Sequence, residues 1–175
     1  LSKNTNVIGV GRSPEKCRAC ETRLRTQYAD SLVRYLVADL SLQKNIHILS
    51  EQITALLLEE NLNHLDGLVN NAGTFIFWFA QTAEGIEVQW AVNHLAPFLF
   101  TQRLLPLLKN APEARVITVS SQNHSWTHMH WKDVQLHRTY NGLTAYSQSK
   151  LANVLFTLGL NQKFGGNSSI RAYAV

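Results

Sequence analysis

Apolar residues recur along this chain in two alternating patterns. Short continuous apolar runs, bounded by Gly, Pro or polar residues, are typical of buried β-strands. Longer stretches in which apolar residues return every three or four positions are typical of helices that pack on one face. The short runs predict strands over residues 6–11, 33–39, 65–70 and 114–120, and the opening of a fifth strand over residues 170–175.

The helical pattern fills the stretches between these strands. Helices are expected from residue 13 to about residue 29, and over residues 42–61, 82–109 and 143–164. Ser13 is suited to cap the first helix, with Pro14 at its first helical position. Pro97 and Pro106 predict a bend or interruption in the third helix. Gly165 and Gly166 predict the end of the fourth.

This repeated order of strand and helix predicts an α/β fold with a parallel sheet covered on both faces. We expect a single domain over residues 1–175, and the sequence contains no internal repeat. Ligands of such sheets bind at the carboxyl ends of the strands. The notable residues after the predicted strands all fall at that edge: Arg12, Asp39, Asn71, Ala72, Gly73, Ser120 and Ser121.

The strongest chemical signal is a tyrosine and a lysine one helical turn apart. Tyr146 and Lys150 lie at i and i+4, so they share a helix face, and Ser121 lies 25 residues upstream at the end of a strand. A phenol titrates near about 10 and is a reluctant base at neutral pH. A cation within about 4–6 Å favours the phenolate. Ser121 could hold a substrate oxygen beside the phenol, although Tyr-x-x-x-Lys alone also occurs on ordinary helices.

Composition narrows the function classes. Apolar residues make up 45% of the 175 residues and charged residues 16%, as expected for a globular chain. The net charge of +4 is scattered rather than gathered in a stripe, which argues against nucleic-acid binding. The most apolar run, residues 95–108, is too short and too polar to cross a bilayer. Cys17 and Cys20 lie in a segment that is typical of the first turns of a basic, solvated helix, so we expect neither a redox site nor a zinc site there.

Four motifs together resemble the short-chain dehydrogenase/reductase family. They are N-N-A-G at residues 70–73, V-N-H-L at 92–95, V-S-S at 119–121 and Y-S-Q-S-K at 146–150. Their order and spacing match the family over essentially the whole chain. The longer runs V-N-H-L-A-P-F-L-F-T and A-Y-S-Q-S-K-L-A-N-V-L-F-T are most similar to the branch of retinol dehydrogenases and WW-domain oxidoreductases.

The resemblance implies a Rossmann-like, doubly wound parallel sheet and a catalytic set. Tyr146 would give or take the proton, and Lys150 would assist it and hydrogen-bond the nicotinamide ribose. Ser121 would orient the substrate carbonyl, and Asn93 would hold a water that links Lys150 to solvent. Plainer interpretations are a strand-end cap for Ser121 and a polar residue at a helix irregularity for Asn93.

The resemblance also implies a nicotinamide cofactor. Asp39 and the backbone of Leu40 match the family's adenine contact, and the turn of Asn71, Ala72 and Gly73 would lie against the cofactor. Arg12 follows the strand that faces the adenosine ribose. An arginine there suits a 2′-phosphate, whereas an acid would favour NAD. We therefore expect NADP rather than NAD, with a solvated loop arginine as the alternative.

One part of the family pattern is not found in these residues. The family opens with a strand and a Gly-rich turn, T-G-x-x-x-G-I-G, which places the pyrophosphate at a helix N-terminus. That strand is central in the sheet, between the strands at residues 6–11 and 65–70. We therefore expect an incomplete sheet, without this first strand and the C-terminal segments that usually close the substrate pocket. The 175 residues alone should bind NADP poorly and turn over little.

The segment over residues 122–142 should wall the substrate pocket. It contains Trp126, Met129 and Trp131, which imply an apolar carbonyl or alcohol substrate, although both tryptophans could equally be plain packing. His124, His128 and His130 could hold a metal, but solvated histidines are the simpler interpretation and no metal site is predicted.

The expected activity is hydride transfer by an NAD(P)(H)-dependent oxidoreductase. The alternatives are a non-catalytic, cofactor-sensing or scaffold protein of the same fold, or a redox protein built on the two cysteines. A homodimer through the helices at 82–109 and 143–164 is possible. We expect a cytoplasmic location, or membrane association through a segment outside these residues.

Overall fold

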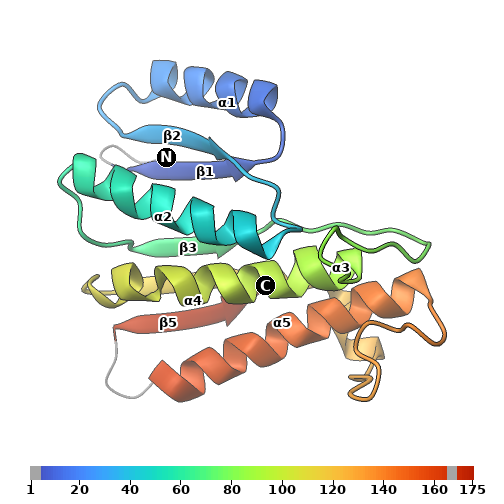
Figure 1. The fold of residues 1–175 in the computed structure, drawn as a ribbon. Helices are drawn as coiled ribbons and strands as arrows, with labels where there is room; N and C mark the ends of the chain where they lie inside the picture. The colour runs from blue at the N-terminus through green and yellow to red at the C-terminus, as the bar shows by residue number, and fades with distance from the viewer. Residues whose placement is uncertain (1–4, 165–168) are drawn as a thin grey trace.

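The computed structural model describes residues 5–164 and 169–175, and it has an α/β architecture built from two parallel sheets (Figure 1). All five predicted strands are present, each within a few residues of its expected bounds. One sheet pairs β1 with β2, and the other has the order β3-β4-β5. The strands are β1 Val7–Gly11, β2 Val33–Val37, β3 Gly67–Asn70, β4 Ala114–Thr118 and β5 Ile170–Ala174.

Helices connect these strands in the predicted order. They are α1 Pro14–Gln27, α2 Gln43–Glu59, the short α3 Val88–Trp90, the π-helical turn η1 Ala91–Leu95, α4 Ala96–Lys109, the 3₁₀ turn η2 Gln122–Trp126 and α5 Gly142–Phe164. The predicted cap of α1 is confirmed, since the Ser13 side chain accepts a 3.2 Å hydrogen bond from the backbone N–H of Lys16. The predicted stop at Gly165 and Gly166 lies outside the described residues.

The helix predicted over residues 82–109 begins later than expected. Gly85 has φ of 75°, a left-handed conformation that glycine adopts readily, and Gln81 forms an isolated antiparallel bridge with Glu87. The Glu87 carboxylate then caps the helix start by accepting from the N–H groups of Gln89 and Trp90. The π-helical turn interrupts the helix just before Pro97, whereas Pro106 lies within α4 without ending it.

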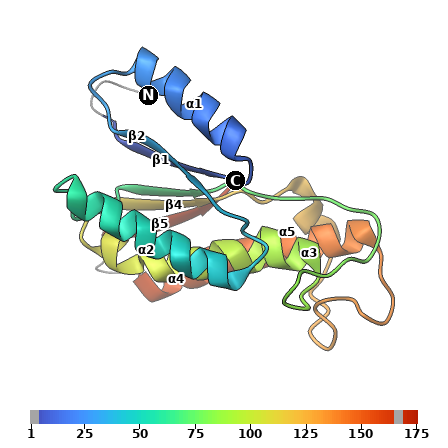
Figure 2. The same ribbon diagram turned by 45° about the horizontal axis from the view of Figure 1, so that its top comes forward.

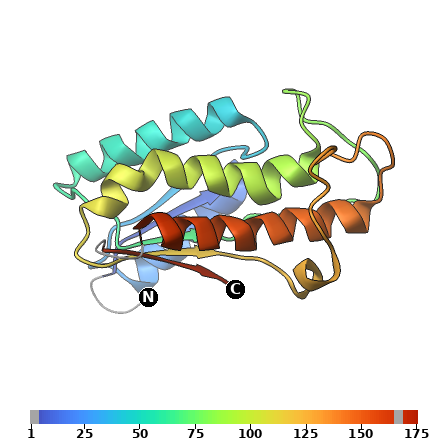
Figure 3. The same ribbon diagram turned by 90° about the horizontal axis from the view of Figure 1, so that it is seen from below.

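One face of the larger sheet packs on helices, and the other does not. Leu68, Val116 and Ala172 share a register row and are buried, and in Figure 3 helices α2, α4 and α5 lie across one side of the molecule. The adjacent row contains Val69 and Tyr173, which are 61% and 44% exposed. The expectation that both faces are covered is therefore wrong for this sheet, because α1 packs on β1 and β2 instead (Figure 2).

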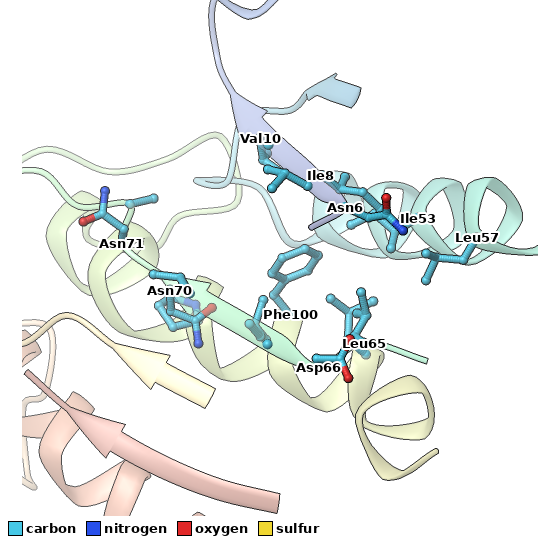
Figure 4. A pocket seen from close by; sticks show the side chains of 18 of the residues that line it. Asn6, Ile8, Val10, Ile53, Leu57, Leu65, Asp66, Asn70, Asn71 and Phe100 are labelled. Carbon is cyan, nitrogen blue, oxygen red and sulfur yellow. The ribbon is translucent and has the colours of Figure 1, made fainter. Parts of the chain in front are cut away.

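A cavity separates the two sheets, and this confirms the incomplete sheet. It has a volume of about 840 Å³ and is lined from one side by β1 and from the other by β3 (Figure 4). Ile8 and Val10 face it from β1, and Phe100 reaches it from α4. Within the described residues, β1 pairs only with β2 and β3 only with β4, so both strands present an edge toward the cavity. Asn71 and Ala72 lie at its carboxyl-end mouth.

Gly142 fixes the start of α5 against the segment that follows β3. A Cβ atom at this position would lie 2.7 Å from the Cα of Phe77, too close for any unshifted backbone. We therefore expect Gly142→Ala to lower the free energy of unfolding by about 1–3 kcal/mol through overpacking. Chemical denaturation of the two proteins measures this difference in the free energy of unfolding.

Gly159, in the same helix, is the matched control, because an added Cβ meets nothing within 4 Å. Gly159→Ala should raise the free energy of unfolding by about 0.5–1 kcal/mol, as an alanine does inside a helix. Equal effects of the two substitutions would contradict the close approach at Gly142.

Candidate active site

Lys150 is the buried centre of the candidate site. Its side chain is 4% exposed, and the ammonium donates a 2.8 Å hydrogen bond to the carbonyl of Val119, directly after β4. Tyr146 precedes it by one turn of α5, and the ammonium nitrogen lies 5.6 Å from the centre of the phenol ring. The predicted juxtaposition of phenol and cation is therefore present in the structure.

Burial sets the electrostatics of this lysine. Removal from water lowers the pKa of Lys150 below its ordinary value, because the charged form loses solvation. The neutral amine is thus favoured more than it would be in water. The carbonyl of Val119 accepts a hydrogen bond from the ammonium and so stabilises the charged form in part.

Asn93 lies in the π-helical turn and is fully buried. Its Oδ1 accepts a 2.7 Å bond from the N–H of Thr74, and its Nδ2 donates to the carbonyl of Thr74 and to Ser149 Oγ, both at 3.0 Å. The side chain therefore ties the segment after β3 to helix α5. It acts as a clamp, a role that the sequence pattern alone did not show.

The turn after β3 is open where a ligand would approach. Asn71, Ala72 and Gly73 are exposed. A Cβ atom on Gly73 would lie 3.4 Å from Asn93 Oδ1 and 3.5 Å from the Lys150 ammonium nitrogen. The bare backbone of Gly73 thus leaves the surface beside the ammonium accessible, as a ribose bearing hydroxyl groups would require.

Ser121 and its neighbour Ser120 have different surroundings. Ser120 Oγ donates a 2.9 Å bond to the carbonyl of Lys150 and so holds α5 against the end of β4. Ser121 is half-buried at the start of η2, where its Oγ accepts a 3.3 Å bond from the N–H of Asn123. Ser121 therefore caps η2, as the plainer interpretation of the sequence expected. Because its Oγ accepts this bond, the hydroxyl hydrogen can still be donated to another group.

An aromatic segment that the sequence analysis did not single out lies against Tyr146. The ring of Phe75 meets the Tyr146 ring edge-on at 5.4 Å, and Phe77 packs on Phe75 at 4.7 Å. Trp126 and Trp131, predicted to wall the pocket, are both exposed. The available signal was the run F-I-F-W-F at residues 75–79, one residue after the N-N-A-G motif.

A buried polar network joins this aromatic segment to the start of α5. Gln89 Nε2 lies within hydrogen-bond distance of the carbonyls of Ile76 and Gly142 and of the Tyr140 hydroxyl, and its two hydrogens serve two of these three acceptors at a time. The Tyr140 hydroxyl donates to Glu87. Burial, together with the Glu87 carboxylate, raises the pKa of Tyr140 to about 12. Tyr140 thus stays protonated and serves as a structural donor.

The remaining cofactor candidates lie at the same edge of the fold. Arg12 directly follows β1 and is exposed, and Leu40 contributes to the cavity lining. The Asp39 carboxylate accepts a 2.9 Å bond from the N–H of Ser41, so it also shapes the turn in which it lies. These positions fit the adenosine end of a dinucleotide, while the described residues contain no Gly-rich phosphate turn.

The alternative sites gain no support. Among residues 5–164 and 169–175, no three His, Cys, Asp or Glu side chains converge as metal ligands. His128 and His130 pack ring to ring, and His124 Nδ1 bonds the Ser121 carbonyl. Cys17 is buried with its thiol toward the Leu36 carbonyl, and both thiols are free. No helix in the described part of the chain is long and apolar enough to span a membrane.

Comparison with known proteins agrees with this geometry. The family model described as short chain dehydrogenase matches residues 1–175. Retinol dehydrogenase 12 from Bos taurus is 41% identical over 157 residues, covering 90% of this chain and 47% of the relative. Retinol dehydrogenase 11 from Homo sapiens is 36% identical over 173 residues, covering 99% of this chain and 52% of the relative. The chain thus spans about half the length of these curated relatives.

Solved structures share the fold. An uncharacterised protein from Mycobacterium Paratuberculosis superposes with a TM-score of 0.76 at 34% identity, over 96% of this chain and 57% of that one. The oxidoreductase yciK from E. coli gives a TM-score of 0.73 at 23% identity, over 96% and 63%, and shows likeness of fold alone. With the family model matching throughout and two retinol dehydrogenases above 35% identity, the chain belongs to the short-chain dehydrogenase family, in its retinol dehydrogenase branch.

Proposed function

We propose that the protein carrying this chain is an NADP(H)-dependent oxidoreductase of an apolar carbonyl or alcohol substrate, and that Tyr146 is its general acid and base. The observation that carries the proposal is the buried Lys150 ammonium, 5.6 Å from the centre of the Tyr146 ring and 2.8 Å from the Val119 carbonyl. Members of this family use NAD or NADP, and the two relatives reported above are named as dehydrogenases.

The nicotinamide, when bound, supplies or removes a hydride at the substrate carbon. The chain's own residues handle the proton. In the reducing direction the Tyr146 hydroxyl gives its proton to the substrate oxygen, and the Lys150 ammonium stabilises the phenolate left behind. In the oxidising direction the phenolate takes the proton of the alcohol. Ser121 donates its hydroxyl hydrogen to the same substrate oxygen and keeps it beside the phenol.

The choice of substrate class rests on the walls beside Tyr146. Phe75 contacts the Tyr146 ring, Phe77 packs on Phe75, and both phenylalanines are exposed apolar side chains. An apolar substrate would remove this surface from water on binding, at about 25 cal/mol per Å² of buried apolar area. The preference for NADP over NAD rests on Arg12, since a guanidinium matches the geometry of a phosphate.

A homodimer through the long helices stays a prediction. Helices α4 and α5 expose Phe98, Leu155 and Leu158. Apolar side chains of this size on neighbouring helices would suit a contact between two copies of the chain.

Replacing the phenol tests the mechanism in the full-length protein. Tyr146→Phe removes one oxygen and should lower kcat by about 10²- to 10⁴-fold, the contribution of general acid–base catalysis. The assay follows NADPH oxidation with a panel of aldehydes and ketones. Tyr28→Phe, at the end of α1, is the matched control and should leave kcat unchanged. An unchanged rate in Tyr146→Phe would show that the mechanism is wrong.

Because the sheet is incomplete, we expect the 175 residues alone to bind NADPH weakly. They contain the ribose-facing edge around Gly73 and Lys150 but no Gly-rich phosphate turn. Their affinity for NADPH should be weaker than micromolar, on the order of millimolar, because the pyrophosphate gains no helix N-terminus. Titration calorimetry measures it. A dissociation constant in the micromolar range would exclude this account of the cofactor site.

A further inference from the structure

Asn153 is a fully buried amide that the proposed mechanism does not use. It lies on α5 three residues after Lys150, so the two side chains share one helix face. Its Nδ2 donates a 2.8 Å hydrogen bond to the carbonyl of Asn93 and makes a longer, 3.4 Å contact with the carbonyl of Val119. Both carbonyls belong to the candidate active site.

The sequence removes one backbone donor that a regular helix would offer to Asn93. In a regular helix the carbonyl of Asn93 would accept from the N–H of residue 97, four positions later. Residue 97 is proline and has no N–H. A buried carbonyl without a partner is costly, because it has lost its hydrogen bonds to water. The Asn153 amide donates to this buried carbonyl from helix α5, beside the π-helical turn.

The second contact couples Asn153 to the ammonium. The carbonyl of Val119 accepts from the Lys150 ammonium at 2.8 Å and faces Asn153 Nδ2 as well. A carbonyl oxygen has two lone pairs, so it can serve both donors. One amide group thus ties the carbonyl that orients Lys150 to the turn that holds Asn93.

His94 orients this amide. Its Nδ1 lies 3.2 Å from Asn153 Oδ1. Because both carbonyls can only accept, the NH₂ group of Asn153 must face them, and Oδ1 must face His94. The histidine therefore carries a hydrogen on Nδ1. Burial lowers the pKa of His94, so the neutral ring with this hydrogen is the favoured form.

We propose that Asn153, oriented by His94, is a positioning residue that sets the placement of Lys150 and Asn93 for proton transfer. The catalytic part of this inference rests on the proposed function. The placement of the ammonium does not, because it can be measured without turnover.

The first test measures Lys150 in the full-length protein by NMR, with lysine labelled at ¹³Cε. Asn153→Ala opens space for water near the ammonium and leaves Val119 with one donor. The pKa of Lys150 should therefore rise from its lowered value toward the ordinary one. The phenol of Tyr146 is a titratable group beside this ammonium, so its resonances are followed in parallel.

Asn161→Ala is the matched control. Asn161 lies on the same helix and also makes two backbone hydrogen bonds, with the carbonyl and the N–H of Ala172, but these hold β5 rather than the site. Its loss should leave the titration of Lys150 unchanged. A folded Asn153→Ala chain with an unchanged Lys150 titration would overturn the proposal.

A second variant covers the case in which Asn153→Ala does not fold. His94→Phe keeps an aromatic ring between Trp90 and Phe98 but removes the donor that orients the amide. It should shift the Lys150 titration in the same direction as Asn153→Ala. If it leaves the titration unchanged, or if it too fails to fold, the network is structural and the proposal is wrong.

The catalytic arm uses the full-length protein. Asn153→Ala should lower kcat by about 10- to 100-fold, as small displacements of catalytic groups do, with little change in KM. Asn161→Ala should change neither. A shifted Lys150 titration with unchanged kcat would overturn the catalytic part alone. A wild-type protein without oxidoreductase activity would instead count against the proposed function and leave the placement of Lys150 standing.

Discussion

The buried ammonium of Lys150 is the constraint around which this end of the fold is arranged. A charge removed from water needs oxygen partners, and the carbonyl of Val119 provides one at 2.8 Å. That carbonyl is available because β4 has just ended and the chain turns toward η2. The position of α5 follows, since Ser120 holds the Lys150 carbonyl and Asn153 faces the same end of the strand. The phenol one turn away is thereby fixed beside the ammonium.

The π-helical turn also fixes the position of a buried polar side chain in the candidate site. A five-residue turn before Pro97 carries Asn93 inward, where its amide bonds the segment after β3 at Thr74 and helix α5 at Ser149. Three elements that are distant in sequence are thus joined by one side chain. The exposed turn of Asn71, Ala72 and Gly73 lies on top of this rigid base, where a cofactor would need an accessible backbone. The incomplete sheet places the cavity between β1 and β3 at the same edge.

Local sequence patterns predicted the helices and strands, whereas several contacts of the candidate site depend on residues that are distant in sequence. The strand and helix order followed from apolar periodicity, and the pairing of Tyr146 with Lys150 followed from helical spacing. The clamp made by Asn93 could not be predicted, because its partner Ser149 lies 56 residues away. The helix start at Val88 was missed because Glu87 caps it through its own side chain after a glycine turn. The contact of Phe75 with Tyr146 could not be predicted, because it depends on the packing of the segment after β3 against α5.

Replacing the ammonium itself tests the central claim most directly. Lys150→Met removes both a buried charge, which is costly, and its hydrogen bond to the Val119 carbonyl, to which Asn153 can still donate. Because these two effects oppose each other, the free energy of unfolding of the full-length protein should change little while activity is lost. The measurement pairs chemical denaturation with NADPH oxidation, and Lys163→Met on the exposed end of the same helix is the control. In Lys150→Met, kcat should fall by about 10²- to 10³-fold, whereas Lys163→Met should leave kcat unchanged. Undiminished turnover without the Lys150 ammonium would contradict it.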